Sequence, residues 1–117
     1  MSVYELQGVP TWDGNNNTWK KFEEDVKEWR MSEDLSRPRS MAGLIKRYLK
    51  GPAKLAVKNM SDKELFTLPP IEKDEKGRRQ LLQPADYIEA NTNGIEALMS
   101  KLNIYDLYRH TYNDTIL

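Results

Sequence analysis

The only histidine of the chain, His110, is the residue on which most catalytic or metal chemistry would depend, because the sequence contains no cysteine. A zinc site would need His110 together with carboxylates, and no His-x-x-x-His or comparable spacing is present. A Ser-His-Asp triad would have to use the same histidine, and no nucleophile motif lies near it. We therefore interpret His110 as a surface or helix-capping residue.

The glycine and carboxylate patterns also give no sign of catalysis. A phosphate-cradling loop needs clustered glycines, whereas those of the central and C-terminal parts of the chain are isolated, at Gly43, Gly51, Gly77 and Gly94. The acidic pair Asp74 and Glu75 stands in a charged segment typical of solvated surface. We predict a non-enzymatic protein with no catalytic residue, no cofactor, no metal and no small-molecule substrate.

A basic segment is the strongest candidate for ligand binding. Acidic residues outnumber basic ones between Asp13 and Asp34, but residues 35–61 contain no acidic residue at all. Their basic side chains are complementary to nucleic-acid phosphates. Lysines on polar helix faces are also ordinary solvated surface, and the net charge of zero favours that interpretation. The candidate nucleic-acid-binding residues are Arg37, Arg39, Lys46, Arg47, Lys50, Lys54 and Lys58.

Aromatic residues near the N-terminus permit a stacking platform for single-stranded nucleic acid, or else a hydrophobic core. The spacing i, i+3, i+7, i+10 of Trp19, Phe22, Val26 and Trp29 defines one face of a helix from about Thr18 to Met31. A domain must bury such a face, so we assign these residues to the core. A turn precedes the helix at 12–15, where we expect Asp13 to bond backbone N–H groups. Asn17 or Thr18 then caps the helix.

Composition and length indicate one domain. The chain has 117 residues, of which 38% are hydrophobic and 31% charged, enough for a single core in a rather polar protein. No apolar run approaches the roughly 20 residues that cross a bilayer, and the N-terminus lacks a secretory pattern. With no cysteine present, we expect a cytoplasmic location and no membrane partner.

Capping and stop signals divide the middle of the chain into short helices. Ser40 is a cap for a helix over roughly 41–50, and Gly51 supplies its left-handed stop. Pro52 suits the first turn of a third helix. Ser61 and Glu64 match a capping box for a short helix that ends near Leu68. The residues expected to be buried here are Met41, Leu44, Ile45, Tyr48, Leu49, Ala53, Ala56, Val57 and Met60.

Residues 71–91 have the least regular pattern. A charged tip around Gly77 favours an exposed mobile loop or a small hairpin. Its base is expected to be anchored by Leu81, Leu82, Tyr87 and Ile88. A fourth helix is then predicted to begin at 91–94, with Ile95, Leu98, Met99 and Leu102 at helical spacing, followed by a last helix that carries Tyr105, Tyr108 and Tyr112.

These elements predict an all-α fold. We expect a compact bundle of about five helices, with an extended N-terminal arm and a long loop or small hairpin between the third and fourth helices. The predicted core comprises Trp19, Phe22, Trp29, Leu44, Tyr48, Leu49, Leu98 and Leu102.

The order of these motifs resembles the N-terminal capsid lobe of Gag-like proteins from LTR retrotransposons of the gypsy and copia types. That family often has a proline, an aromatic-Asp-Gly turn and a helix with an early Trp, here Pro10, Trp12-Asp13-Gly14, Trp19, Phe22 and Trp29. A helix then ends in Leu-x-Gly-x-Ala, here residues 49–53. A short acidic segment at 62–65 follows, and then a helix that carries Gly94-Ile95, Leu98 and Leu102.

The resemblance covers most of residues 9–112 and implies an all-helical lobe that self-associates into shells. The whole of 1–117 would then be one Gag-like capsid N-terminal domain, which forms homo-oligomers in the full-length protein and is expected to be monomeric as an isolated lobe. Residues 71–91 are longer than the usual connection, and the C-terminal lobe and Cys-His zinc knuckle of the family are missing. RNA binding by the basic segment at 37–58, or peptide binding by a domesticated relative, are the alternatives.

Overall fold

One long helix, α5 (Pro84–Ile116), organises the fold. In this computed structural model the described residues are 8–79 and 81–116, with side chains described as far as residue 107. They form no strand, and their helices before α5 are a short 3-10 turn η1 (Asn16–Thr18), α1 (Trp19–Ser32), α2 (Met41–Tyr48), α3 (Gly51–Ala56) and α4 (Asp62–Leu65). The predicted all-α bundle is therefore confirmed. Of the extended arm, residues 1–7 lie outside the described part.

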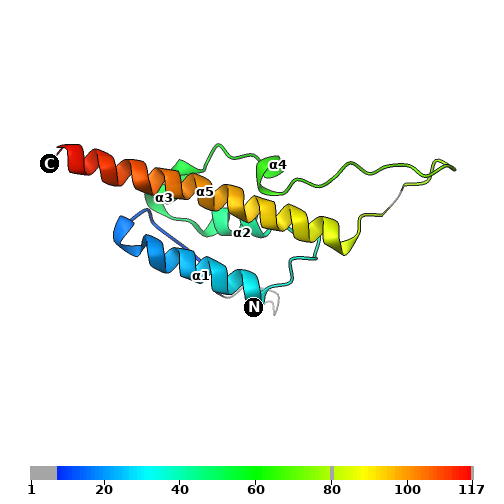
Figure 1. Ribbon diagram of the computed structural model, residues 1–117, viewed down its shortest axis with the longest axis horizontal. Helices are drawn as coiled ribbons and strands as arrows, with labels where there is room; N and C mark the ends of the chain where they lie inside the picture. Colours follow the sequence, from blue (N-terminus) through cyan, green and yellow to red (C-terminus); the bar gives the residue numbers. More distant parts are fainter. Residues whose placement is uncertain (1–7, 80, 117) are drawn as a thin grey trace.

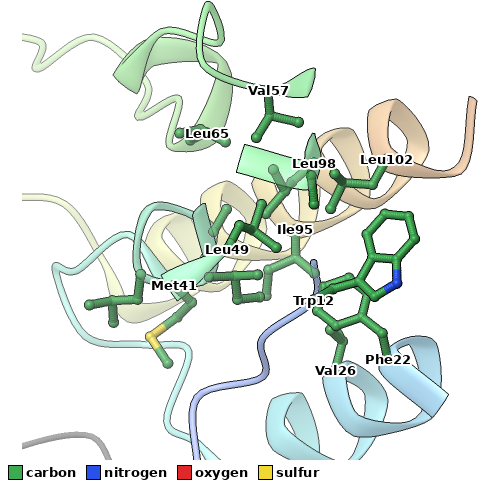
Figure 2. Packing of buried hydrophobic residues seen from close by; sticks show 14 of the residues in the cluster. Trp12, Phe22, Val26, Met41, Leu49, Val57, Leu65, Ile95, Leu98 and Leu102 are labelled. Carbon is green, nitrogen blue, oxygen red and sulfur yellow. The ribbon is translucent and has the colours of Figure 1, made fainter. Parts of the chain in front are cut away.

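The helices pack around α5 from several sides. In Figure 1, α5 runs from the C-terminus at the left to the base of the hairpin at the right, with α1 below it and α4 above it. Helices α2, α3 and α4 each contact α5. Figure 2 shows Ile95, Leu98 and Leu102 of α5 in the middle of the buried cluster, between Val26 of α1 and Val57 near the end of α3.

The buried aromatic face of α1 is as predicted from its spacing. Trp19, Phe22, Val26 and Trp29 are all buried in one core with Leu98 and Leu102. The predicted cap is only partly correct: Thr18 precedes α1 but makes no side-chain capping bond. Asn15 instead caps the 3-10 turn, where its side chain accepts from the N–H of Asn17. The extra turn forms because this Asn satisfies a free donor earlier in the chain.

Helix α2 has the predicted cap, but the predicted burial of one of its residues, Tyr48, is wrong. The Oγ of Ser40 accepts from the N–H of Gly43 at 2.9 Å. Tyr48, expected in the core, is the last residue of α2 and is 47% exposed. The chain leaves the helix after it, and Leu49 takes the buried position instead.

The C-terminal helix is longer than predicted. The segment 91–94 was expected to start a helix, but α5 begins at Pro84 and passes through it without a break. Gly94 is a contact point within the helix: a Cβ there would stand 1.7 Å from the carbonyl oxygen of Leu65 in α4. Asn91 is fully buried, and its Oδ1 accepts from the N–H of Met41 while its Nδ2 donates to the carbonyl of Leu35, both at 2.9 Å. Asn91 and Gly94, whose residue types suggested a helix start, thus make tertiary contacts in the interior of α5.

The irregular segment is a projecting hairpin between α4 and α5. The predicted location between the third and fourth helices is the same place in the chain, because that numbering left out the short helix α4. An isolated antiparallel bridge joins Lys73 to Arg79, and the excursion extends past the N-terminal end of α5 (Figure 1). The expected anchors are only partly correct, since Leu81 is 86% exposed and Ile88 is also exposed. Tyr87 is half-buried and stacks on Phe66, with ring centroids 6.4 Å apart.

Candidate functional site

The turn at 12–14 contacts the corner between α2 and α3 directly. The N–H of Lys50 donates to the carbonyl of Trp12 at 3.0 Å, and the hydroxyl of Thr11 donates to the carbonyl of Tyr48. A Cβ on Gly14 would stand 3.2 Å from the backbone nitrogen of Ala53. Gly14 has a φ of +97°, and any other residue would be strained there.

Aromatic rings continue this junction into the core. The buried ring of Trp12 packs against three other aromatic rings. The distance between ring centroids is 4.8 Å to Trp19, 5.7 Å to Phe22 and 6.3 Å to Tyr105. Its Nε1 donates to the carbonyl of Asn15 at 2.9 Å. The aromatic residues are therefore core, as the sequence predicted, and are not a platform on which a base can stack.

Asp13 plays the backbone role that was predicted for it. Its Oδ1 accepts from the N–H of Asn15 at 2.9 Å, which holds the turn that leads into α1. Among the described residues, no three His, Asp or Glu side chains gather as a metal site would require. The side chain of His110 lies outside the described part of the chain.

The basic side chains of residues 37–58 are dispersed. The guanidinium of Arg37 pairs with Asp34 at 3.7 Å. The Nζ of Lys46 donates to the carbonyl of Met60 at 2.8 Å and so closes the turn after α3. Lys50 borders a hollow that also has Lys21 and Asp25 on its wall. Lys54 and Lys58 are exposed at and after the end of α3.

Arg39 and Arg47 do come together, in a groove between α2 and α4. This groove measures about 560 Å³ and is also lined by Lys63 and Phe66, with Leu44 and Gly43 in its wall. The sequence did not point to Lys63 or Phe66, because they stand beyond the end of the basic segment. Only the packing of α4 beside α2 places them there. We call this surface the cationic groove, defined by Arg39, Arg47, Lys63 and Phe66.

A second groove lies between α1 and α5 and is mainly apolar at its base. It measures about 490 Å³. Its apolar lining comes from Val26, Met31, Ile95 and Met99, and its charged rim from Glu23, Lys27, Arg30 and Glu96. Met31 is 80% exposed, an unusual amount for a large apolar side chain in a helix whose other apolar residues are buried. We call this surface the α1–α5 groove.

Comparison of the chain with protein-family models, with curated proteins and with solved structures finds no match. Among the described residues, no helix has the length and apolar character that crossing a bilayer requires.

Proposed function

We propose that the chain is the N-terminal capsid lobe of a Gag-like protein of the LTR-retrotransposon type. In this role it is a structural, non-enzymatic domain of the cytoplasm, and its main partner is another copy of itself. Weak contacts between lobes, repeated many times, hold a particle shell together.

The observation that carries the proposal is the junction between the turn at 12–14 and the α2–α3 corner. The resemblance depended on two separate motifs, Trp12-Asp13-Gly14 and the segment 49–53. These motifs meet in space, joined by the bond from Lys50 to Trp12 and by the close approach of Gly14 to Ala53. A third motif residue, Gly94, is where α5 touches α4. Motifs that fit one another in three dimensions support a shared fold more strongly than motifs that share only an order.

The α1–α5 groove supplies a surface suited to contact between copies. Its rim carries two acidic residues, Glu23 and Glu96, and two basic ones, Lys27 and Arg30. In a two-fold contact the same patch faces itself, so a rim with both signs of charge is complementary to its own copy. The exposed thioether of Met31 provides adaptable apolar contact at the centre. A single contact of this kind is weak and holds a shell only when it is repeated many times, so the isolated lobe is expected to be monomeric.

Electron microscopy of the full protein to which the lobe belongs, under assembly conditions, tests this proposal. Particles are expected, and Met31→Asp should prevent or strongly reduce them while the lobe stays folded by circular dichroism. Leu55→Asp is the matched control, because Leu55 is also a largely exposed apolar residue, on α3 and outside the α1–α5 groove. No particles from a folded wild-type protein would argue against a capsid function. Equal loss in both variants would argue against the groove as the contact.

A peptide-binding adaptor is the second candidate, favoured by the same apolar lining. A short amphipathic helix could place its apolar residues against Val26, Ile95 and Met99. Such a protein would bind peptides as an isolated lobe and would form no particles in full length. Those two results together distinguish the adaptor from the capsid lobe.

A further inference from the structure

We infer that the cationic groove between α2 and α4 binds single-stranded nucleic acid, through phosphate contacts and one stacked base. This function goes beyond the proposed structural role, because it needs no contact between copies. It assigns the binding to Arg39, Arg47, Lys63 and Phe66, of which only the two arginines belong to the basic segment of the sequence.

The charge of the groove is available to a ligand. In the part of the chain that the structure describes, no ion pair or hydrogen bond occupies the side chains of Arg39, Arg47 or Lys63. Asp62 is the one acidic residue in the lining. The neighbouring cations differ, since Arg37 is paired with Asp34 and Lys46 is bonded to backbone carbonyls. Two guanidinium groups suit phosphate oxygens, to which they can donate two parallel hydrogen bonds.

An aromatic ring in the same groove favours nucleic acid over an acidic protein segment. Phe66 is half-buried, lines the groove and stacks on Tyr87 with an interplanar angle of 23°. Bases of a single strand stack on such rings beside a positively charged track. In a duplex the base faces are already stacked and covered, so the ring would find no partner. The acidic side chains of a protein segment would pair with the cations of the groove but would have no group to stack on the ring of Phe66.

The experiment measures binding of a fluorescent oligouridine to the 117-residue chain by anisotropy at several salt concentrations. Two double variants remove the same charge at different places: Arg39→Gln with Arg47→Gln inside the groove, and Lys54→Gln with Lys58→Gln outside it. Phe66→Leu keeps an apolar side chain against Tyr87 but removes the stacking face. Circular dichroism and thermal unfolding verify that each variant is folded. A polyglutamate peptide serves as the competing ligand class.

The groove double variant should weaken binding at least tenfold near physiological salt. It should also lower the slope of log affinity against log salt by about 1.4, since each phosphate contact to a single strand contributes about 0.7. The outside double variant should change affinity by less than about twofold. Phe66→Leu should weaken binding about fivefold or more with the salt slope unchanged, because stacking is not an ionic contact.

Three outcomes would overturn the inference. Equal losses of affinity in the two double variants would mean that oligouridine binds to any positive surface charge and that the groove is not a specific site. Tighter binding of polyglutamate than of oligouridine, unaffected by Phe66→Leu, would assign the groove to an acidic protein partner. No binding of oligouridine even at low salt would leave the groove without this ligand. None of these outcomes bears on particle formation, so the capsid proposal stands or fails separately.

Discussion

The backbone N–H of Lys50 donates a hydrogen bond to the carbonyl of Trp12, 38 positions earlier in the chain, at 3.0 Å. This bond fastens the turn before α1 to the corner between α2 and α3. Gly51, directly after the donor, has a φ of +52°, and a Cβ there would stand 3.4 Å from the carbonyl oxygen of Asp13. The corner therefore depends on glycine at backbone positions where any other residue would be strained.

Replacement of Gly94 by Ala should destabilise the protein by at least about 2 kcal/mol, although Ala is the better helix former by about 1 kcal/mol. The added Cβ would overlap the carbonyl oxygen of Leu65 at 1.7 Å, so α4 and α5 would have to separate. Asn93→Ala is the control, because Asn93 is the exposed neighbour on the same helix and the change should be neutral or stabilising. Urea unfolding measures both. A stabilised Gly94→Ala variant would show that the two helices do not touch there.

Trp29→Ala should cost about 3–5 kcal/mol, because the side chain is only 5% exposed and its removal leaves a large cavity. Met31→Ala, two residues further along α1, should cost less than about 0.5 kcal/mol, because Met31 is 80% exposed. Denaturant titration followed by circular dichroism compares the two. A loss below about 1 kcal/mol for Trp29→Ala would place this ring on the surface.

Limited trypsin digestion should cut first between Lys76 and Arg79. All the residues of this hairpin tip from 75 to 79 are exposed, whereas the basic residues of the body lie on or beside helices. The two fragments should stay associated, because α4 and α5 remain in contact through Leu65 and Gly94. Mass spectrometry of early time points, with native gel electrophoresis, gives the readout. First cleavage within α2 or α3 would mean that the hairpin is protected.

The hairpin tip should respond to acid. Backbone N–H groups of Arg78 and Lys76 donate to the Asp74 carboxylate at 2.8 and 2.9 Å, and the guanidinium of Arg78 adds a third bond. These bonds, the Arg78 N–H foremost, hold the pKa of Asp74 below its ordinary value of 3.8. A lowered pKa means that the carboxylate supports the hairpin above pH 3.8 and that this support is lost as the pH falls through the folded-state pKa.

NMR titration of the Asp74 carboxyl carbon and of the Arg78 amide checks this expectation. Both signals should report one midpoint below 3.8, and Asp74→Asn should shift the Arg78 amide at every pH. A midpoint at or above 3.8 would contradict the bonding pattern at the tip.

Local signals in the sequence were sufficient for much of the fold. The 3.6-residue spacing on α1 predicted its buried face, and the capping patterns at Ser40 and Ser61 predicted the starts of α2 and α4. Both depend on residues close in sequence, so no tertiary information was needed. Gly51 has the left-handed conformation that was expected, but it is the first residue of α3 and not the stop of α2, which ends at Tyr48 with an extended Leu49.

Tertiary contacts decided the features that the sequence did not predict. The Asn and Gly residues at 91–94 are typical of a helix start, but the bonds of Asn91 to Met41 and Leu35 keep this segment inside α5. Tyr48 has helical spacing with the core, yet the helix ends at this residue. The cationic groove combines Arg47 with Lys63 across two helices, so a scan for basic runs could find only half of it.

The projecting hairpin has a practical consequence for engineering. Its two legs lie side by side at their base, where residues 69–72 and 81–83 line one hollow, while the tip points away from the helices (Figure 1). Added sequence between Lys76 and Gly77 would begin and end at neighbouring points, so it would demand little of the helical core. The hairpin is thus a site at which the protein can display a foreign epitope or a small guest domain without disturbing its helices.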